Sequence, residues 1–283
     1  MHKGPFAGHA LKIVVLLLML EFLSSCYPEY RLARTYINND HRVSLLILPA
    51  NYIFKKNLKV DEFENKDSIA GYQLDSALMA NSMFLSKVSD SIFLERFVNS
   101  MIDEFIRLGY DVYTEGMLDS FLYVKGPAYI LNIAQIELEE HYDVHEARQQ
   151  VGDYTYFKNI DLNAISYNFW FELNELNAET KDPKILFAGE TINDVVHGYF
   201  TESLFTGEVA YKYDIDEIDM DIIYQYSQYF GRRCAGYTFD YLMNKYIEMN
   251  WPPGQNLRYY MQYKRENNSL DPTIQDRFIE LKD

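Results

Sequence analysis

The segment 162–176 alternates apolar and polar side chains along its length. Polar side chains fill most of the positions between the apolar ones. The apolar side chains, at every second position, are Ile165, Tyr167, Phe169, Phe171 and Leu173. Successive side chains of a β-strand point to opposite faces of the sheet, so this pattern predicts a strand with one apolar face. A chain with such a strand must fold so that helices or another layer cover that face.

Further strands are predicted on either side of this segment. The apolar run 42–50 is short and continuous, which is typical of a strand buried on both faces. The segments 128–139 and 184–196 also show strand patterns, and polar links join them to 162–176. This order favours an antiparallel meander, in which the longer link 140–159 is an exposed loop.

Helical patterns cover the segment after residue 89 and the C-terminal third of the chain. Apolar residues recur at three- and four-residue steps over 89–108, and Gly109 supplies the expected C-terminal stop. The pattern becomes helical again after Thr201, with helices over 215–230 and 235–249 and a break at Gly231. The predicted fold class is therefore α/β of the α+β type: a mostly antiparallel sheet packed by one long helix and C-terminal helices.

The N-terminus carries a secretory-type signal that ends in a lipobox. A charged start, the apolar run 13–20 and the sequence Leu23-Ser24-Ser25-Cys26 stand in the order of a signal peptide. The run is shorter than the roughly 20 residues that cross a bilayer. This pattern resembles bacterial lipoprotein signals, which implies that residues 1–25 are removed and that Cys26 carries a diacylglycerol and an N-acyl chain. The alternative is an ordinary signal peptide with an incidental cysteine.

The residues after Cys26 indicate where such a lipoprotein is held. Tyr27 stands where lipoproteins of the inner membrane of enteric bacteria carry Asp. Glu29 is the single nearby acidic residue, whereas surface-exported lipoproteins of the Bacteroidota type carry an acidic cluster. The resemblance therefore implies an outer-membrane anchor with the protein facing the periplasm. The predicted organisation is a signal peptide (1–25), a tether (26–41), a single α/β domain (42–250) and a C-terminal tail (251–283).

A series of short motifs occurs in order over residues 42–196. They are Leu46-Ile47-Leu48-Pro49, Leu108-Gly109-Tyr110-Asp111-Val112-Tyr113, Leu118-Asp119, Gly126-Pro127-Ala128-Tyr129-Ile130-Leu131-Asn132-Ile133, and Phe171-Glu172-Leu173-Asn174 with Lys184-Ile185-Leu186. Their order resembles the α/β module shared by the curli-secretion lipoprotein and the amino-terminal domain of the Tol–Pal translocation protein. The chain departs from that module at 175–183, which lacks the turn glycine, and at the long insertion 140–159. The resemblance implies a binding or assembly module with no catalytic residues.

Charge and motif content argue against two classes of function. The formal net charge is −16 at pH 7, so the chain repels phosphate backbones and we expect no nucleic-acid partner. The sequence contains no Gly-x-Ser-x-Gly, no His-Glu-x-x-His and no phosphate-binding glycine loop. With Cys26 lipidated, Cys234 is the one remaining cysteine, and a buried apolar role is typical of such a residue. We therefore expect a protein that is not an enzyme and needs no cofactor.

One segment has the spacing of metal ligands. His141 and His145 are four residues apart with carboxylates beside them, and on a helix they would share one face. The segment follows a predicted strand, so the alternative is a solvated hairpin end with no fixed ligand geometry. The acidic run 214–221 lacks the glycine that a calcium loop needs at its sixth position, and it instead predicts the start of a helix.

The predicted tail holds the candidate partner-binding residues. Arg258, Tyr259, Tyr260 and Tyr263 follow the helix stop at 251–254 and belong to a locally basic segment of an acidic protein. Aromatic and Arg side chains close together are typical of binding hot spots. The alternative is that the basic tail folds back on the acidic body as an intramolecular strap.

The leading functional hypothesis is a non-enzymatic accessory or docking lipoprotein in envelope secretion, transport or assembly. Such a protein reaches the membrane through its lipid anchor and binds other envelope proteins. The alternatives are a small-ligand or metal-binding periplasmic protein that uses the segment around His141 and His145 and, third, a hydrolase.

Overall fold

The computed structural model describes residues 28–38, 43–60, 71–177, 183–254 and 256–281. The predicted signal peptide and Cys26 lie outside these residues. The described residues form two compact units: the larger comprises those of 43–235 and 278–283, and the smaller comprises those of 1–42 and 236–277. Helix α6 (Met220–Met249) gives its first part to the larger unit and the rest to the smaller one.

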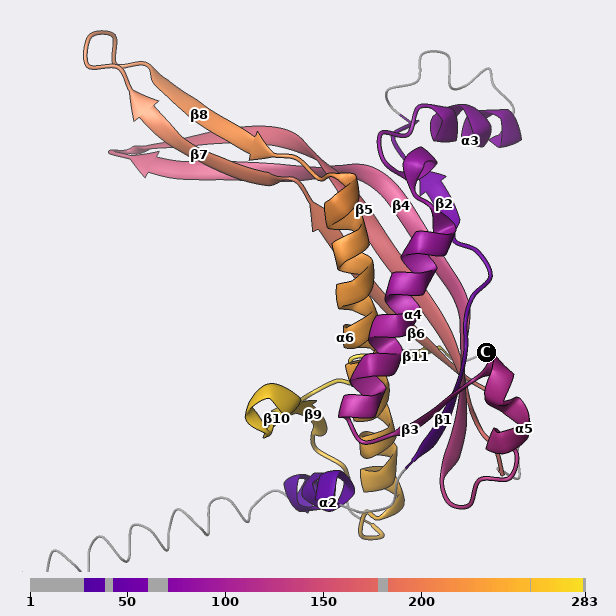
Figure 1. Cartoon of the computed structure of the whole chain (residues 1–283). Coiled ribbons are helices and arrows are strands. Elements are labelled where there is room, and N and C mark those ends of the chain that lie inside the picture. Colours follow the sequence, from indigo (N-terminus) through magenta and orange to yellow (C-terminus); the bar gives the residue numbers. More distant parts are fainter. Residues whose placement is uncertain (1–27, 39–42, 61–70, 178–182, 255, 282–283) are drawn as a thin grey trace, which may run out of the picture. The chain divides into compact units, whose positions relative to one another are not determined.

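The larger unit is built on a mixed seven-stranded sheet (Figure 1). Its strands follow the order β11-β6-β5-β4-β1-β3, and β2 also pairs with β4. The long strands β4, β5 and β6 pair antiparallel, whereas the short strands β1, β2 and β3 form parallel pairs. The predicted fold class is confirmed. The strands are β1 (Ser44–Leu48), β2 (Phe54–Asn57), β3 (Asp111–Thr114), β4 (Ala128–Val151), β5 (Tyr154–Glu175), β6 (Lys184–Asn193) and β11 (Ile279–Leu281).

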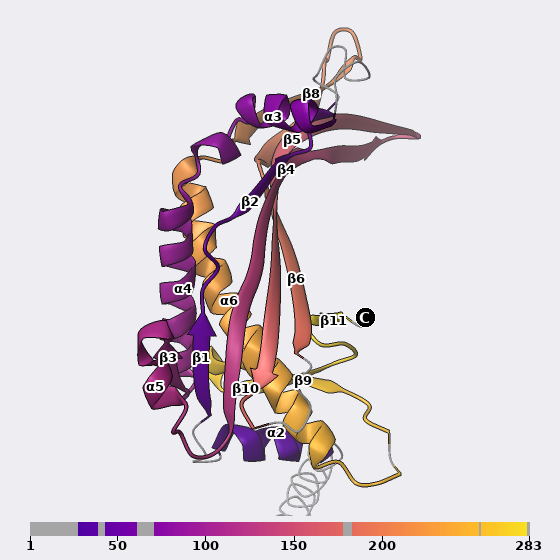
Figure 2. The same cartoon turned by 90° about the vertical axis from the view of Figure 1, so that its right-hand side faces the viewer.

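Helices α4 (Asp90–Arg107) and the first part of α6 cover one face of this sheet (Figures 1 and 2). The alternating apolar residues of β5 meet aromatic rings from both helices: Phe97 lies 5.0 Å from Phe169, and Phe230 lies 4.8 Å from Tyr167, measured between ring centroids. The face predicted for the segment 162–176 is therefore the buried face. Shorter helical segments in this unit are α3 (Gly71–Ala80), η3 (Leu85–Lys87), η4 (Glu115–Met117) and α5 (Leu118–Phe121).

The predicted break at Gly231 is wrong, because α6 is one continuous helix of 30 residues. A Cβ added to Gly231 would lie 2.2 Å from the carbonyl oxygen of Phe97 and 2.2 Å from Oγ of Ser100. The glycine therefore lets α6 and α4 approach closely, and it does so at a cost in helix propensity.

Strands β4 and β5 extend well beyond their predicted ends. They are 24 and 22 residues long, and their antiparallel register continues from Glu140 paired with Ile165 to Val151 paired with Tyr154. The link 140–159 is therefore a paired hairpin rather than a loop. Its side chains alternate without an apolar face, so strand periodicity was not visible there.

A second hairpin covers 195–216, where the pattern after Thr201 was expected to become helical, and the helix predicted over 215–230 begins at Met220. Strands β7 (Val195–Glu202) and β8 (Val209–Asp216) pair antiparallel with each other, and β7 also contacts β4. In Figure 1 this hairpin runs alongside the outer part of β4 and β5. We call the outer hairpin of β4 and β5 (141–163) and the hairpin of β7 and β8 (195–216) the hairpin arms.

The smaller unit combines α2 (Pro28–Asn38), the rest of α6, and the hairpin of β9 (Tyr260–Lys264), η5 (Arg265–Asn267) and β10 (Ser269–Thr273). The α6 side chains Asp240 and Asn244 bind the backbone of β9: Tyr263 N donates to Asp240 Oδ1 at 2.8 Å, and Met261 N donates to Asn244 Oδ1 at 2.8 Å. Side chains one helical turn apart thus substitute for a neighbouring strand. The predicted tether contains a helix, and the predicted polar tail is folded as strands.

Candidate functional site: the hairpin arms and the groove beside helix α6

A buried carboxylate lies where the outer hairpin of β4 and β5 leaves the sheet. Glu140 is fully buried and accepts hydrogen bonds from Ser82 Oγ at 2.6 Å, Lys59 Nζ at 2.9 Å and the backbone N of Met83 at 3.0 Å. Burial opposes ionisation, but these hydrogen bonds and the charge of Lys59 outweigh it and lower the pKa of Glu140. The carboxylate therefore stays charged, and it fixes the segment before α4 to β4.

The polar contacts continue from this carboxylate to the second arm. Lys59 Nζ donates to Asn163 Oδ1 at 2.7 Å, and Asn163 Nδ2 donates to Asp194 Oδ2 at 2.8 Å. Asp194 lies between β6 and β7, and its Oδ1 accepts the backbone N of Ile218 at 2.8 Å, just before α6. Lys59, Ser82, Glu140, Asn163 and Asp194 form what we call the branch-point network. It ties the bases of both hairpin arms to the rest of the larger unit.

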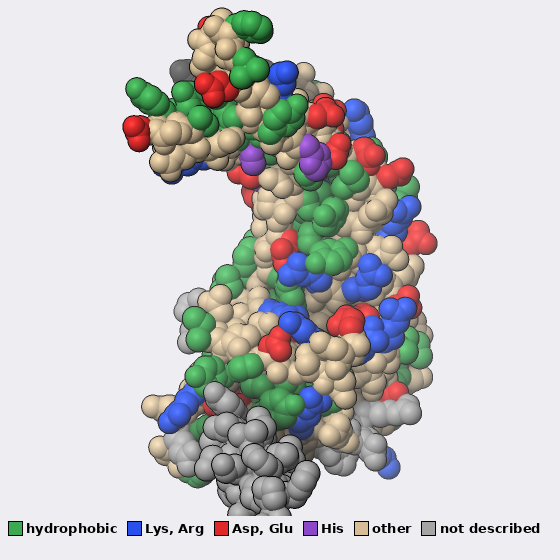
Figure 3. All heavy atoms as spheres, turned by 90° about the vertical axis from the view of Figure 1, so that its left-hand side faces the viewer, with side chains coloured by type: hydrophobic (Ala, Val, Ile, Leu, Met, Phe, Trp, Pro, Cys, Tyr) green, Lys and Arg blue, Asp and Glu red, His purple; other side chains and the backbone are tan. Residues whose placement is uncertain are grey.

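The hairpin arms expose large apolar side chains. Figure 3 shows hydrophobic side chains spread over the region at the top of that view. The exposed residues on the outer hairpin of β4 and β5 are Tyr142, Val144, Tyr154 and Phe157, and those on β7, β8 and their connecting loop are Val195, Tyr199, Leu204, Phe205 and Tyr213. Exposed apolar side chains gathered on one element are typical of interaction surfaces, whereas single ones are common on any protein.

Leu204 and Phe205 at the tip of the β7–β8 hairpin are the most exposed of these side chains. Each is 99% exposed. The loop that carries them is hydrogen-bonded within itself: Gly207 N donates to the carbonyl of Ser203 at 2.8 Å, and Ser203 N donates to the carbonyl of Glu208 at 2.9 Å. The loop therefore holds two adjacent apolar side chains outward in an ordered turn. We call Leu204 and Phe205 the apolar tip.

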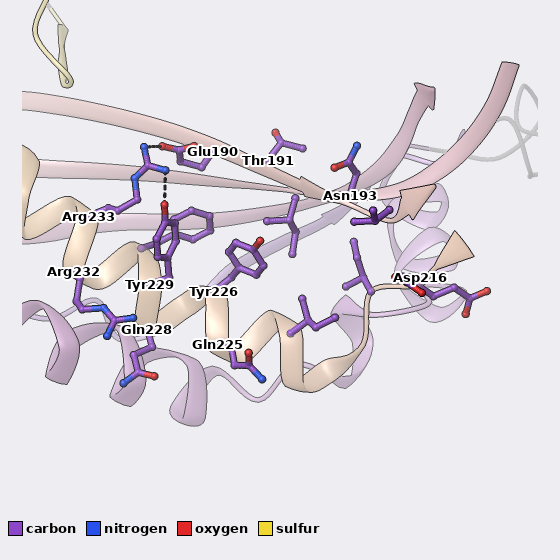
Figure 4. A pocket seen from close by; sticks show the side chains of 16 residues that line it. Glu190, Thr191, Asn193, Asp216, Gln225, Tyr226, Gln228, Tyr229, Arg232 and Arg233 are labelled. Carbon is purple, nitrogen blue, oxygen red and sulfur yellow. Dashed lines mark hydrogen bonds and ion pairs between the residues drawn. The ribbon is translucent and has the colours of Figure 1, made fainter. Parts of the chain in front are cut away.

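A groove of about 990 Å³ lies between β6 and the first part of α6. The strand wall is formed by Glu190 to Asn193, and Tyr226, Tyr229 and Arg233 point toward that wall from α6 (Figure 4). Arg233 donates to Glu190 at 2.8 Å and to the hydroxyl of Tyr229 at 3.0 Å. The volume of the groove is in the range of ligand-binding sites.

The two ends of this groove carry opposite charge. Arg232 and the ion pair of Arg233 with Glu190 lie at one end and Asp216 at the other in Figure 4, and Glu217 follows Asp216 in the lining. Asp216 also lies 3.0 Å from Nε2 of His197 on β7. Apolar side chains of Ile192, Ile218 and Ile222 line the space as well. The groove therefore suits an elongated molecule with apolar groups and with charges of opposite sign at its two ends.

The two histidines predicted as metal ligands lie on strand β4 rather than on a helix or a loop. Four residues of a strand span about 13 Å, so His141 and His145 are too far apart to bind one ion together. His141 Nε2 instead lies 2.9 Å from Oγ of Ser166. Within the described part of the chain, no group of three or more His, Cys, Asp or Glu side chains is placed to bind a metal.

The candidate partner-binding residues of the predicted tail lie at the β9 hairpin. Tyr263 packs against Phe239 of α6 at 5.4 Å between ring centroids, and its hydroxyl donates to Asn268 at 3.3 Å. Tyr259 and Tyr260 are half-buried, and Arg258 is exposed, with its backbone N donating to Glu29 at 3.2 Å. These contacts hold the segment against α6 and α2 within the smaller unit, and partner binding by these residues stays a prediction.

Two further sequence candidates have structural roles. Cys234 is buried, and burial raises the pKa of its thiol despite the neighbouring Arg233, so a reactive thiolate is not favoured there. Asp219 of the acidic run accepts the backbone N of Ile222 at 2.7 Å at the start of α6. This contact agrees with the predicted acidic helix start.

The apolar tip and the groove were not predicted from the sequence. The pattern after Thr201 favours a helix, in which an adjacent apolar pair such as Leu204 and Phe205 carries no signal of exposure. The groove depends on β6 meeting α6, and no local pattern indicates that contact.

None of the helices in the described residues combines the length and apolarity needed to cross a bilayer. In comparisons with known proteins, no family model and no curated protein matches the chain.

Proposed function

We propose that this protein is a non-enzymatic lipoprotein that docks to another envelope protein through its hairpin arms. In this proposal Cys26 is lipidated, and the protein is anchored to the outer membrane facing the periplasm. The arms serve an accessory role in secretion, transport or assembly across the envelope.

The lipobox supports the anchor. Cys26 follows small residues and a short apolar run, in the order of a lipoprotein signal. Metabolic labelling with a palmitate analogue tests this part: the wild-type protein is expected to carry the label and Cys26→Ala to lack it. Equal labelling of the two proteins contradicts lipidation.

The observation that carries the docking proposal is the apolar tip. Two large apolar side chains, each 99% exposed, are held by an ordered loop at the end of a hairpin. Exposing such side chains to water is unfavourable by about 1.5–3 kcal/mol each relative to burial, so the arrangement favours a partner that covers them. The branch-point network supports the same reading, because it fixes the bases of the arms.

Crosslinked co-purification from membranes tests the docking. We expect the double variant Leu204→Ser/Phe205→Ser to recover at least about tenfold less partner than the wild-type protein, since apolar anchors dominate binding energy. The matched control is Tyr123→Ser/Ile274→Ser, which removes two side chains that are each 85% exposed elsewhere. Equal loss of partner from both variants, or from neither, contradicts docking by the apolar tip.

A further inference from the structure

Strand β6 is the edge strand of the main sheet beside the groove. Within the described residues, β11 pairs with Ile185, Leu186 and Phe187 of β6. β6 continues to Asn193. Among the described strands, none pairs with this second half of β6 on the side away from β5. An edge strand offers backbone donors and acceptors to any extended segment that lies beside it.

The same half of β6 forms one wall of the groove. Its residues Glu190, Thr191, Ile192 and Asn193 line the space, and exposed aromatic side chains Tyr226 and Tyr229 line it from α6. An extended peptide of six residues is about 20 Å long, which matches the six positions from Ala188 to Asn193. The groove thus places apolar and aromatic side chains where alternate side chains of an added strand would point.

We propose that an extended peptide segment of a partner protein binds in this groove and adds to the edge of β6 as an antiparallel strand. The charges along the groove determine which charged residues the peptide carries and where they lie in it. β6 runs from Glu190, beside Arg233, to Asn193, near Asp216 (Figure 4). An antiparallel peptide therefore begins near Asp216 and Glu217 and ends near the pair of Arg233 with Glu190, with Arg232 on the outer side of α6. It carries a basic residue in its N-terminal half, an acidic residue in its C-terminal half, and apolar residues between them.

This peptide site is separate from docking by the apolar tip. If no peptide binds the groove, Leu204→Ser/Phe205→Ser is still expected to recover less partner. If the apolar tip does not dock, the peptide experiment keeps its expected result. The two proposals are therefore tested independently.

Selection from a displayed library of random octapeptides on the purified mature chain tests the proposal. We expect enriched peptides in which a Lys or Arg precedes alternating apolar residues and an Asp or Glu. Synthetic copies are expected to slow amide exchange from Ala188 to Asn193, and N-methylation of their alternate amides is expected to abolish binding.

Charge variants complete the test. Arg232→Glu is expected to weaken the selected peptides about tenfold, and Asp216→Lys to weaken them similarly. The matched control Arg148→Glu changes an exposed arginine on the outer hairpin of β4 and β5 and is expected to leave binding unchanged. The proposal is overturned if no peptide is enriched, if enriched peptides leave exchange of these amides unchanged, or if Arg232→Glu and Arg148→Glu have equal effects.

Discussion

At the scale of single residues, the branch-point network depends most on Glu140. Its carboxylate is fully buried and binds Lys59 Nζ at 2.9 Å. Removing one member of a buried ion pair leaves the other charge without compensation, at a cost of about 3 kcal/mol or more. We expect Glu140→Gln to lower the free energy of unfolding in urea at pH 7 by at least this amount. Glu146→Gln, an exposed position on the same strand, is the control and is expected to change it by less than about 0.5 kcal/mol.

The same residue predicts a pH dependence. The pKa of Glu140 is lowered in the folded protein, so its contribution to stability is present above the ordinary pKa of Glu and is lost as the pH falls through the lowered value. Glu140→Gln is therefore expected to lose less stability than the wild type between about pH 5 and pH 3. Parallel acid-unfolding curves for the two proteins in this range contradict the assignment.

Asp240 of the smaller unit predicts a pH dependence of stability opposite to that of Glu140. Burial raises the pKa of this carboxyl to about 7, although Arg277 and the backbone N of Tyr263 favour its charged form. The folded state therefore holds the proton more tightly than the unfolded state, and stability falls as the pH rises from about 4 to about 7. We expect the melting temperature of Asp240→Asn to change less between about pH 4 and pH 7 than that of the wild type. A variant whose melting temperature falls with pH as steeply as that of the wild type contradicts this explanation.

At the scale of elements, the contact between α4 and α6 depends on Gly231. Alanine is about 1 kcal/mol better than glycine within a helix, yet a Cβ here would lie 2.2 Å from the Phe97 carbonyl oxygen. We expect Gly231→Ala to lower the free energy of unfolding by about 2 kcal/mol, because the two helices must separate. Gly236→Ala in the same helix is the control, since its nearest neighbour is Arg277 Nη1 at 4.0 Å. Its expected effect is a gain of up to about 1 kcal/mol, and two equal effects contradict the close-approach argument.

Local sequence patterns predict those elements that bury one face of their own. The alternation in β5 and the helical spacing of α4 predicted both elements, because their apolar positions, among them Tyr167, Phe169 and Phe97, are the buried side chains of the core. The hairpin arms bury little, and polar side chains fall on both of their faces, so a loop and a helix were predicted there. The break predicted at Gly231 has the same origin: helix propensity is local, whereas the close approach of α4 is not. The groove and the apolar tip depend on such non-local pairing and were missed for this reason.

The C-terminal strands give a further prediction at this scale. Truncation after Gly254 removes β9, β10 and β11 and with them the buried side chains of Met261, Leu270 and Phe278. Each such side chain contributes about 1.5–3 kcal/mol when buried, so we expect the melting temperature to fall by about 10 °C or more. Arg258→Ser in the full chain is the control and is expected to leave it within about 2 °C. An unchanged melting temperature after truncation contradicts the strap and restores the docking tail as the better interpretation.

At the scale of the whole molecule, the proposed function divides between separate parts of the chain. In this proposal the lipobox supplies the anchor, the branch-point network fixes the bases of the hairpin arms, and the apolar tip contacts the partner. The strong negative charge of the chain argues against an anionic lipid surface as the structure that covers the tip. Glu202 and Glu208 beside the tip favour a protein surface in which basic residues surround an apolar pocket.

Photo-crosslinking from the tip in living cells tests this central claim most directly. The variant Phe205→p-benzoylphenylalanine is expected to yield a discrete crosslinked protein species on irradiation, identified by mass spectrometry. The same photoreactive residue at Tyr123, which is 85% exposed but distant in sequence from the arms, is expected to yield none. Crosslinks from Phe205 to lipid alone, or the same pattern of products from both positions, would contradict docking through the hairpin arms.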